Sequence, residues 1–256
     1  MNILNLFFPV GLYCISCGRP LPPAEENSPA LCESCAGEIQ WVAGRSCEKC
    51  GRPLSDENPA KLCHNCVDNP SRSYTKGCAC ALYSGRAAEI VRDMKYRDRA
   101  WYAETVAALM ADRYYEEADP ATGELPCYDH IAAVPMAQKK KTSRGYDQAA
   151  LIAKGLSSRI GVPYLSKALV RVRETGIMSS LSGEERRQNL RGAFSVGYDM
   201  IKTVSNKRIL LADDVLTTGS TAEACAEALI AAGAGRVDVI VFAIGADSRG
   251  RPSGCG

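Results

Sequence analysis

Residues 208–221, RILLADDVLTTGST, decide the fold class of this chain. The apolar run ILLA is typical of a strand buried on both faces, as the strands of parallel sheets are. Two adjacent carboxylates, Asp213 and Asp214, follow this run, and ligand sites form at the carboxyl ends of parallel strands. The stretch therefore predicts an α/β fold with a ligand site where this strand ends.

The second half of the stretch has the composition of a phosphate-binding turn. It consists of Thr217, Thr218, Gly219, Ser220 and Thr221, and it leads into an alanine-rich helix. Glycine permits close backbone approach, hydroxyls donate hydrogen bonds, and the amides at a helix start favour an anion. The turn has no lysine and is not a P-loop. A sugar phosphate suits both halves of the stretch, and a strand followed by a Ser/Thr-capped helix is the plainer alternative.

The rest of the chain after residue 77 alternates between strand and helix patterns. The expected strands are 78–83, 130–134, 193–196, 208–212 and 237–244, with an extended stretch at 164–169. The expected helices are 86–96, 101–117, 148–160 and 220–232. This order predicts a mainly parallel sheet with flanking helices. Residues 246–256 are expected to form a flexible tail.

Eight of the thirteen cysteines lie in four C-x-x-C pairs near the amino terminus. The pairs are Cys14/Cys17, Cys32/Cys35, Cys47/Cys50 and Cys63/Cys66. Such spacing is typical of zinc ribbons. Residues 14–35 and 47–66 both open with CxxCGRPL and close with LCxxC, so each repeat is expected to supply one four-cysteine site; an interleaved arrangement is the alternative. We expect two structural Zn²⁺ ions, because four thiolates leave no coordination position open for chemistry.

Composition limits the partners and the compartment. The 256 residues carry a net charge of +2, which requires neither nucleic acid nor an acidic membrane as a partner. Residues 1–77 hold 7 Lys+Arg against 8 Asp+Glu, whereas a DNA-binding ribbon is expected to be basic. No apolar run is long enough to span a bilayer, and the apolar residues 3–13 lack the features of a signal peptide. We therefore expect a cytoplasmic protein with no membrane span.

Residues 208–221 resemble the motif with which type I phosphoribosyltransferases bind 5-phosphoribosyl-1-pyrophosphate (PRPP). The resemblance implies that Asp213 and Asp214 hydrogen-bond the ribose hydroxyls, while the turn 217–221 binds the 5-phosphate. It also places a pyrophosphate loop at Val134, Pro135, Met136 and Ala137. A basic run follows that loop, formed by Lys139, Lys140, Lys141 and Arg144. Beside a diphosphate site, such a run suits a loop that neutralises the departing pyrophosphate and could close over the site; a solvated, flexible loop is the plainer alternative.

The chain as a whole resembles the ComF family of competence-associated, phosphoribosyltransferase-like proteins. The matching motifs are the CxxC pairs, MKY (94–96), VPM (134–136), RGYDQA (144–149), LSGEERRQNLRGAF (181–194) and the PRPP motif. Two positions depart from the family pattern, which usually has Asn at Asp147 and Gln at Met178. Both departures concern the acceptor side of the expected pocket.

The resemblance implies a double zinc ribbon at 1–77 and a phosphoribosyltransferase domain at 78–245. The implied reaction transfers a 5-phosphoribosyl group from PRPP to a nitrogenous acceptor and releases pyrophosphate, with Mg²⁺ bridging the diphosphate and ribose oxygens. One alternative is a non-catalytic, PRPP-binding regulatory protein. Another, by family association alone, is a DNA-uptake accessory protein that binds single-stranded DNA or a competence helicase. A basic patch of Arg92, Lys95, Arg97 and Arg99 would support DNA binding.

Overall fold

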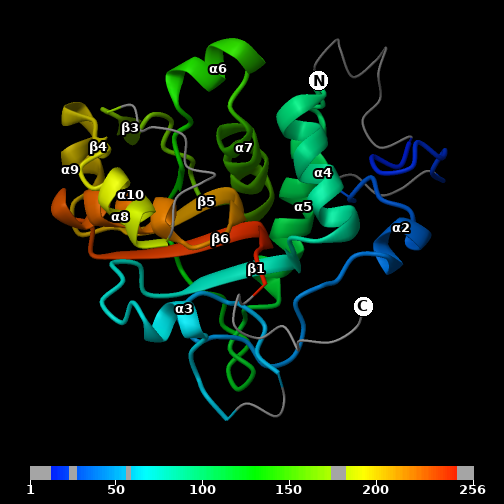
Figure 1. Ribbon diagram of the computed structural model, residues 1–256, viewed down its shortest axis with the longest axis horizontal. Coiled ribbons are helices and arrows are strands. Elements are labelled where there is room, and N and C mark those ends of the chain that lie inside the picture. Colours follow the sequence, from blue (N-terminus) through cyan, green and yellow to red (C-terminus); the bar gives the residue numbers. More distant parts are fainter. Residues whose placement is uncertain (1–12, 23–27, 56–58, 174–182, 247–256) are drawn as a thin grey trace.

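The core of the protein is a parallel sheet of four strands in the order β1-β6-β5-β2 (Figure 1). The computed structural model describes residues 13–22, 28–55, 59–173 and 183–246. The strands are β1 (Gly77–Leu82), β2 (His130–Ala133), β5 (Arg208–Leu216) and β6 (Arg236–Ile244). All three pairings are parallel. The α/β prediction is confirmed, because the central strands are apolar and buried on both faces.

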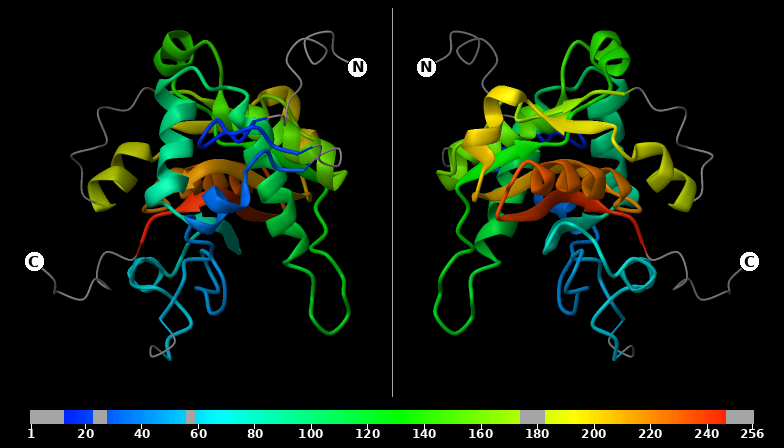
Figure 2. Two further views of the ribbon diagram at one scale, coloured as in Figure 1. Left: turned by 90° about the vertical axis from the view of Figure 1, so that its right-hand side faces the viewer. Right: turned by 90° about the vertical axis from the view of Figure 1, so that its left-hand side faces the viewer.

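Helices cover both faces of the sheet (Figures 1 and 2). One face packs against α4 (Gly85–Tyr96), α5 (Tyr102–Tyr115) and α7 (Gln148–Ile160) in a single buried cluster. The other face packs against α10 (Ser220–Ala231), beside which lies α8 (Gly183–Leu190). The four expected helices are present, with ends that differ from the expectation by no more than two residues.

The remaining elements lie outside the central sheet. Strands β3 (Leu169–Arg171) and β4 (Phe194–Val196) form an antiparallel pair that packs on α10. The short helices are α6 (Gln138–Arg144), η1 (Tyr198–Met200) and α9 (Ile201–Val204). Tyr164 makes a parallel bridge with Ile131, so part of the expected extended stretch continues the sheet beyond β2.

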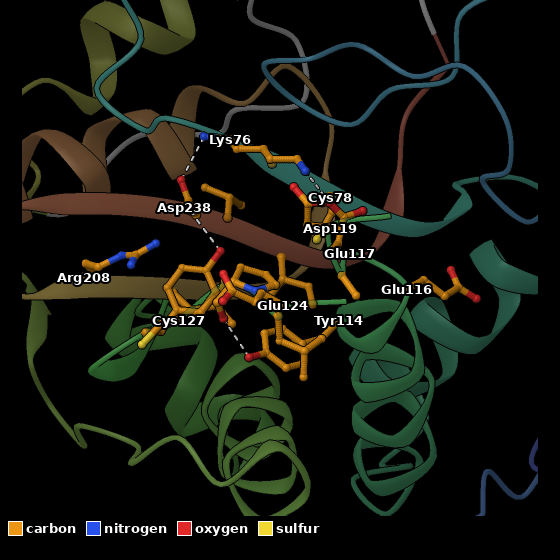
Figure 3. Close-up of a pocket in the computed structure, with 18 of the residues that line it drawn as sticks. Lys76, Cys78, Tyr114, Glu116, Glu117, Asp119, Glu124, Cys127, Arg208 and Asp238 are labelled. Atoms are coloured by element: carbon orange, nitrogen blue, oxygen red, sulfur yellow. Dashed lines mark hydrogen bonds and ion pairs between the residues drawn. The ribbon is translucent and has the colours of Figure 1, made fainter. Parts of the chain in front are cut away.

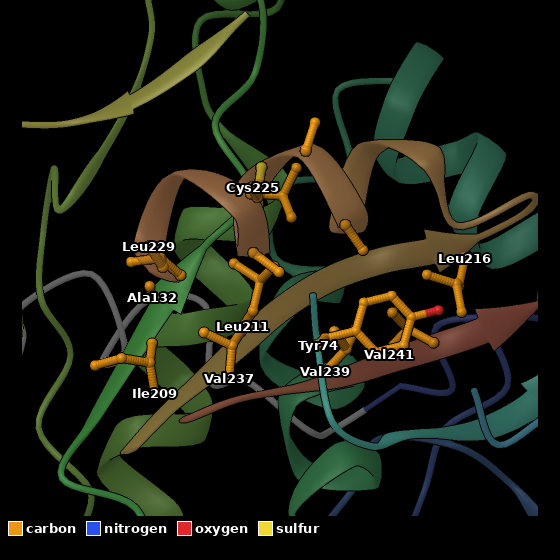
Figure 4. Close-up of a cluster of buried hydrophobic side chains, with 14 of the residues drawn as sticks. Tyr74, Ala132, Ile209, Leu211, Leu216, Cys225, Leu229, Val237, Val239 and Val241 are labelled. Carbon is orange, nitrogen blue, oxygen red and sulfur yellow. The ribbon is translucent and has the colours of Figure 1, made fainter. Parts of the chain in front are cut away.

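The two cysteine-containing units pack on opposite faces of the sheet. The first unit contains α2 (Glu33–Gly37), and its Ile15, Ala30 and Ile39 join the cluster of α4 and α5. The second unit contains α3 (His64–Val67), and its four cysteines join the cluster around α10. Figure 4 shows Tyr74, which follows this unit, among Leu216, Val239 and Val241 of that cluster.

The segment between the two units protects the edge of the sheet. Trp41 makes an antiparallel bridge with Ala81 of β1. The amide of Val42 donates to the carbonyl of Cys80, and the amide of Leu82 donates to the carbonyl of Gln40. Since an exposed edge strand invites pairing with another chain, this segment both links the units and covers that edge.

Two sequence-based expectations about local structure are wrong. The strand expected at 208–212 continues to Leu216, because Val215 and Leu216 extend its buried, alternating pattern past the acids. The basic run is not a loop but helix α6, in which Gln, Lys and Arg are good helix formers and Gly145 ends the helix with φ +76°.

Several expectations lie outside the described residues or remain untested. Residues 3–12, Met178 and the tail from 247 onward fall outside the described ranges. The domain boundaries after residues 77 and 245 remain predictions. Within the described parts of the chain, no helix is long and apolar enough to cross a membrane.

Candidate functional site

Asp213 and Asp214 lie side by side inside β5 and point to opposite faces of the sheet. Asp213 lies on the same face of β5 as Leu211, which packs in the cluster with α10. Asp214 lies on the other face, toward the cluster of α4, α5 and α7. The amide of Asp214 donates to the carboxylate of Asp213 at 2.8 Å. Burial, reinforced by the neighbouring Asp214 carboxylate, raises the pKa of Asp213 to about 8. Asp213 therefore holds a proton more firmly than an exposed aspartate does.

Lys95 supplies the positive charge that Asp214 faces. Its ammonium Nζ lies 2.9 Å from Oδ1 of Asp214, and the two side chains are 24% and 9% exposed. Burial alone would lower the pKa of Lys95, but the Asp214 carboxylate outweighs that effect and raises it. Lys95 therefore belongs to the acidic site. The prediction that Lys95 belongs to a basic surface patch is therefore wrong. A second residue of that patch, Arg97, pairs with Asp93 at 3.3 Å.

The motif RGYDQA fixes the end of α4, which carries Lys95. The hydroxyl of Tyr146 and the side-chain amide Nε2 of Gln148 both donate to the carbonyl of Met94, at 2.5 and 3.1 Å. The guanidinium of Arg144 lies 5.1 Å above the ring of Tyr96. Residues before and after Lys95 are thus held by one segment, which explains why MKY and RGYDQA meet beside Asp214.

The turn after β5 brings backbone amides and hydroxyls together at the start of α10. Within the described residues, the amides of Thr217, Thr218 and Gly219 make no hydrogen bond. Gly219 has φ +81°, a conformation that favours glycine, and α10 begins at Ser220. The hydroxyls of Thr218 and Ser220 are 2.9 Å apart. This arrangement of amides, hydroxyls and a helix start is suited to a phosphate.

Residues 134–137 follow β2, the strand next to β5. The amide of Val134 donates to the carbonyl of Ala212, which places this loop beside the acids. Asp147 caps α7 by accepting from the amide of Ala150 at 3.2 Å, and its second oxygen accepts from the amide of Met136 at 3.4 Å. The departure from the family pattern at Asp147 therefore places a carboxylate against the loop expected to bind pyrophosphate.

The basic residues of α6 divide into two kinds. Lys139, Lys140 and Lys141 are exposed. Arg144 is partly buried and donates to the side-chain oxygen of Gln148 at 3.1 Å. The three lysines are therefore accessible at the surface, whereas Arg144 contacts Tyr96 and Gln148.

The eight cysteines form two separate clusters, each built from one repeat. In each cluster the four sulfur atoms lie within 4.8 Å of one another. Two of the separations are 3.6 Å, between Cys50 and Cys63, and 3.8 Å, between Cys17 and Cys32. Tetrahedral Zn–S bonds of roughly 2.3 Å place sulfur atoms about 3.8 Å apart, so both clusters fit zinc. The pairing is sequential, and the interleaved alternative is excluded.

A cavity in the described part of the chain lies away from this site. It has a volume of about 560 Å³ and lies at the amino ends of β1, β5 and β6 (Figure 3). Its charged groups largely satisfy one another, because Arg236 pairs with Asp238 and Lys76 pairs with Glu117. Ligands of parallel sheets bind at the opposite, carboxyl ends of the strands. The candidate site is therefore the one built on Asp213, Asp214 and the turn.

Comparison with known proteins matches both parts of the chain. Residues 3–81 match the family model of the double zinc ribbon domain, and residues 144–255 match that of the phosphoribosyl transferase domain. A relative from Haemophilus influenzae named competence protein F is 31% identical over 209 residues, which cover 81% of this chain and 86% of the relative. The chain belongs to the ComF family.

Other relatives of this ComF-family protein carry a different name. DNA utilization protein YhgH of Salmonella typhi is 28% identical, covering 88% of this chain and 94% of the relative. The protein of the same name from Escherichia coli K12 is 28% identical over 75% of this chain and 81% of the relative. Among solved structures, adenine phosphoribosyltransferase from Trypanosoma brucei matches 87% of this chain and 84% of its own, with 12% identity and a TM-score of 0.37.

Most residues of the candidate site lie in motifs that the sequence analysis singles out. Three residues have a role that the sequence analysis does not predict. Lys95 was assigned to a surface patch, although MKY was a recognisable motif that contained it. Arg52 and Arg72 of the second unit donate to carbonyls of the turn. Arg52 lies in the repeated CGRPL, so the repeat was the available signal, whereas nothing in the sequence marks Arg72.

Proposed function

We propose that this protein binds PRPP with Mg²⁺ and transfers its 5-phosphoribosyl group to a nitrogenous acceptor, releasing pyrophosphate. The observation that supports the proposal is the juxtaposition of Asp213 and Asp214 with a turn in which the amides of Thr217, Thr218 and Gly219 make no hydrogen bond within the described residues. Carboxylates accept from ribose hydroxyls, and unpaired amides donate to a 5-phosphate. One sugar phosphate can use both at once.

The residues around the acids suit the charge of such a ligand. The carboxylate oxygens of Asp213 and Asp214 are hard ligands of the kind that Mg²⁺ takes, and the ion when bound would offset the diphosphate charge. In the described structure Lys95 neutralises Asp214, so the site does not hold two uncompensated carboxylates. Lys139, Lys140 and Lys141 would approach the diphosphate from α6.

The transfer needs positioning and charge stabilisation more than proton chemistry. The bond between C1 of the ribose and the pyrophosphate oxygen breaks, a bond from C1 to the acceptor nitrogen forms, and the nitrogen loses a proton. Charge gathers on the departing pyrophosphate, where the lysines of α6 would stabilise it. The match to the phosphoribosyl transferase domain model supports this reaction type. We propose the acceptor as a chemical class, a nitrogen nucleophile.

One assay separates an enzyme from a PRPP-binding regulator. Pyrophosphate release is measured with PRPP, Mg²⁺ and a panel of ammonia, amines and nucleobases. We expect release that one acceptor accelerates. Replacing Lys139, Lys140 and Lys141 with Gln should then lower kcat about tenfold or more, and lower PRPP affinity less, because these contacts tighten as pyrophosphate departs. Lys154→Gln, which changes an exposed lysine of α7, is the control. Tight PRPP binding without release for any acceptor would instead support the regulator.

A second candidate function is binding of single-stranded DNA. The observation in its favour is an exposed pair of aromatic side chains, Tyr96 and Trp101, each stacked with an arginine, Arg144 and Arg99 respectively. Stacking of bases on aromatic rings beside arginines is how many proteins bind single strands. The test is salt-dependent binding of an oligonucleotide that Trp101→Ala weakens.

We also propose that the protein is cytoplasmic, where its clustered thiols would stay reduced.

A further inference from the structure

The second cysteine unit reaches the turn that the proposed function assigns to the 5-phosphate. Arg52, which follows Cys50 by two residues, donates to the carbonyl of Thr217 at 2.6 Å. Arg72, which follows Cys66 by six residues, donates to the carbonyl of Thr218 at 3.0 Å. Two arginines of one unit therefore hold two consecutive carbonyls of the turn.

Holding these carbonyls sets the direction of the amides. In a trans peptide unit the carbonyl of one residue and the amide of the next point in opposite directions. Fixing the carbonyls of Thr217 and Thr218 on the side of the second unit therefore directs the amides of Thr218 and Gly219 away from it. Those amides make no hydrogen bond within the described residues, so they are available as donors on the side away from the second unit.

The contact between Arg72 and the turn is close. A Cβ at Gly219 would collide with the guanidinium of Arg72 and lie 3.3 Å from the hydroxyl of Tyr74. The guanidinium of Arg72 also stacks on the ring of Tyr74, with its carbon 5.4 Å from the ring centre. The amide of Ser73 donates to the carboxylate of Glu223, in the first turn of α10, at 2.6 Å. The second unit is thus packed against both the turn and the helix start.

The cysteine cluster in turn holds these arginines. The amide of Cys47 donates to the carbonyl of Arg52 at 2.7 Å. Arg72 donates to the carbonyl of Asn65, which lies between Cys63 and Cys66 in α3. The side chain of Arg52 is nearly fully buried, and it donates to the carbonyls of Gly245, Ala246 and Thr217. A zinc ion with four thiolates carries net negative charge, so a filled cluster would also offset this buried cation.

The first unit offers a contrast within the same molecule. It packs on the opposite face of the sheet, where Ile15 and Ala30 join the cluster of α4 and α5 and the amide of Ala30 donates to Thr105. No hydrogen bond or ion pair in the described residues joins the first unit to residues 213–221. The two units are alike in sequence but differ in what they support.

We propose that Arg52 and Arg72 are positioning residues for the 5-phosphate, and that zinc in the cluster of Cys47, Cys50, Cys63 and Cys66 sets the affinity of the site for it. The first cluster stabilises the fold without this role. The inference rests on the proposed function, because it assumes that the turn binds a phosphate. It assigns to one of two similar zinc sites a part in ligand binding.

The test compares two halves of PRPP on the full-length, zinc-loaded protein. Calorimetry measures the affinities of ribose 5-phosphate and of magnesium pyrophosphate for wild type, Arg72→Gln, Cys47→Ser and Cys14→Ser. We expect Arg72→Gln and Cys47→Ser to weaken ribose 5-phosphate about 10- to 100-fold and to leave pyrophosphate unchanged, as for loss of a charge-assisted hydrogen bond. Cys14→Ser should bind both ligands as wild type does. Arg45→Gln is the matched control, since Arg45 also donates to a carbonyl, that of Ala60, inside the second unit.

Hydrogen exchange of the ligand-free proteins gives an independent measurement. The amide of Glu223, which donates to the carbonyl of Gly219 in the turn at 2.8 Å, should exchange faster in Arg72→Gln and Cys47→Ser than in wild type or Cys14→Ser. Arg72→Gln retains both clusters, so it carries the test if Cys47→Ser does not fold. Normal ribose 5-phosphate affinity in Arg72→Gln, or equal weakening by Cys14→Ser and Cys47→Ser, would overturn the inference. Failure of wild type to bind ribose 5-phosphate would refute the proposed function, and exchange would still decide whether the second unit holds the turn.

Discussion

At the scale of single residues, the two adjacent carboxylates of the site differ in their surroundings. Asp214 has a cationic partner in Lys95, while Asp213 has a pKa raised to about 8 by burial and by Asp214. Because alternate residues of a strand face opposite sides, adjacent acids reach different surroundings. Asp214 is therefore paired with a cation, whereas Asp213 keeps its proton to a higher pH than an exposed aspartate does.

The raised pKa of Asp213 predicts that ligand binding releases a proton. The ionised form is the one that accepts from ribose hydroxyls and binds Mg²⁺, so PRPP affinity should rise as pH increases from 7 toward the pKa near 8, and level off above it. Calorimetry at pH 7 in two buffers with different ionisation enthalpies should show proton release, which should be absent at pH 9 and in Asp213→Asn. Identical heats in both buffers at pH 7 would contradict this account.

The pairing of Lys95 with Asp214 predicts a cost of breaking it. Lys95→Met should lower the free energy of unfolding by about 3 kcal/mol, because it leaves a buried carboxylate without a partner. Lys95→Met combined with Asp214→Asn should recover much of that loss, as urea unfolding of all four proteins would measure. Lys61→Met is the control, since Lys61 and Glu48 pair at the surface and are 78% and 61% exposed. Additive losses in the double variant would show that the pair does not stabilise the fold.

At the scale of elements, the strand β5, its turn and α10 form the unit that the sequence predicts best. The apolar run, the acids and the turn are all local in sequence, so their order alone defines strand, site and helix. The partners of these residues are not local. Lys95 comes from α4 and Arg72 from the second unit, and such contacts depend on how distant segments pack. The sequence analysis does not predict the short helices α6 and α8, because their residues are mostly polar and show no periodic apolar pattern.

The turn itself gives a prediction that separates the two ends of PRPP. Thr218→Val removes a hydroxyl that lies 2.9 Å from that of Ser220, and Gly219→Val forces a side chain against Arg72. Each should weaken PRPP and ribose 5-phosphate about 10- to 100-fold and change free pyrophosphate little. Competition calorimetry measures all three ligands on the same samples. Equal losses for pyrophosphate would mean that the turn does not discriminate the 5-phosphate, and normal PRPP binding would favour a simple helix cap.

At the scale of the whole molecule, the repeat in the sequence predicted the cysteine pairing correctly. A unit duplicated as a whole brings its own four ligands, and the structure groups Cys14 through Cys35 and Cys47 through Cys66 in that way. The sequence did not indicate that the two units lie on opposite faces of the sheet, because near-identical motifs contain no information on their different neighbours.

The two clusters predict a metal content of two Zn²⁺ ions per chain. Cys14→Ser and Cys47→Ser should each lose one ion and retain the other, because each cluster is complete within one unit. Elemental analysis of protein purified under reducing conditions measures this directly. Loss of both ions from either variant would show that the two units fold together, and a folded protein without metal would contradict the zinc assignment.

The central claim is that the acids and the turn form one PRPP site, and a single titration tests it most directly. Mg²⁺ and PRPP are titrated by calorimetry into wild type and into the double variant Asp213→Asn, Asp214→Asn. The account predicts one PRPP bound per wild-type chain, with affinity that falls without Mg²⁺, and no detectable binding to a double variant that remains folded and zinc-loaded. Absence of binding to wild type, or equal affinity in the double variant, would contradict it.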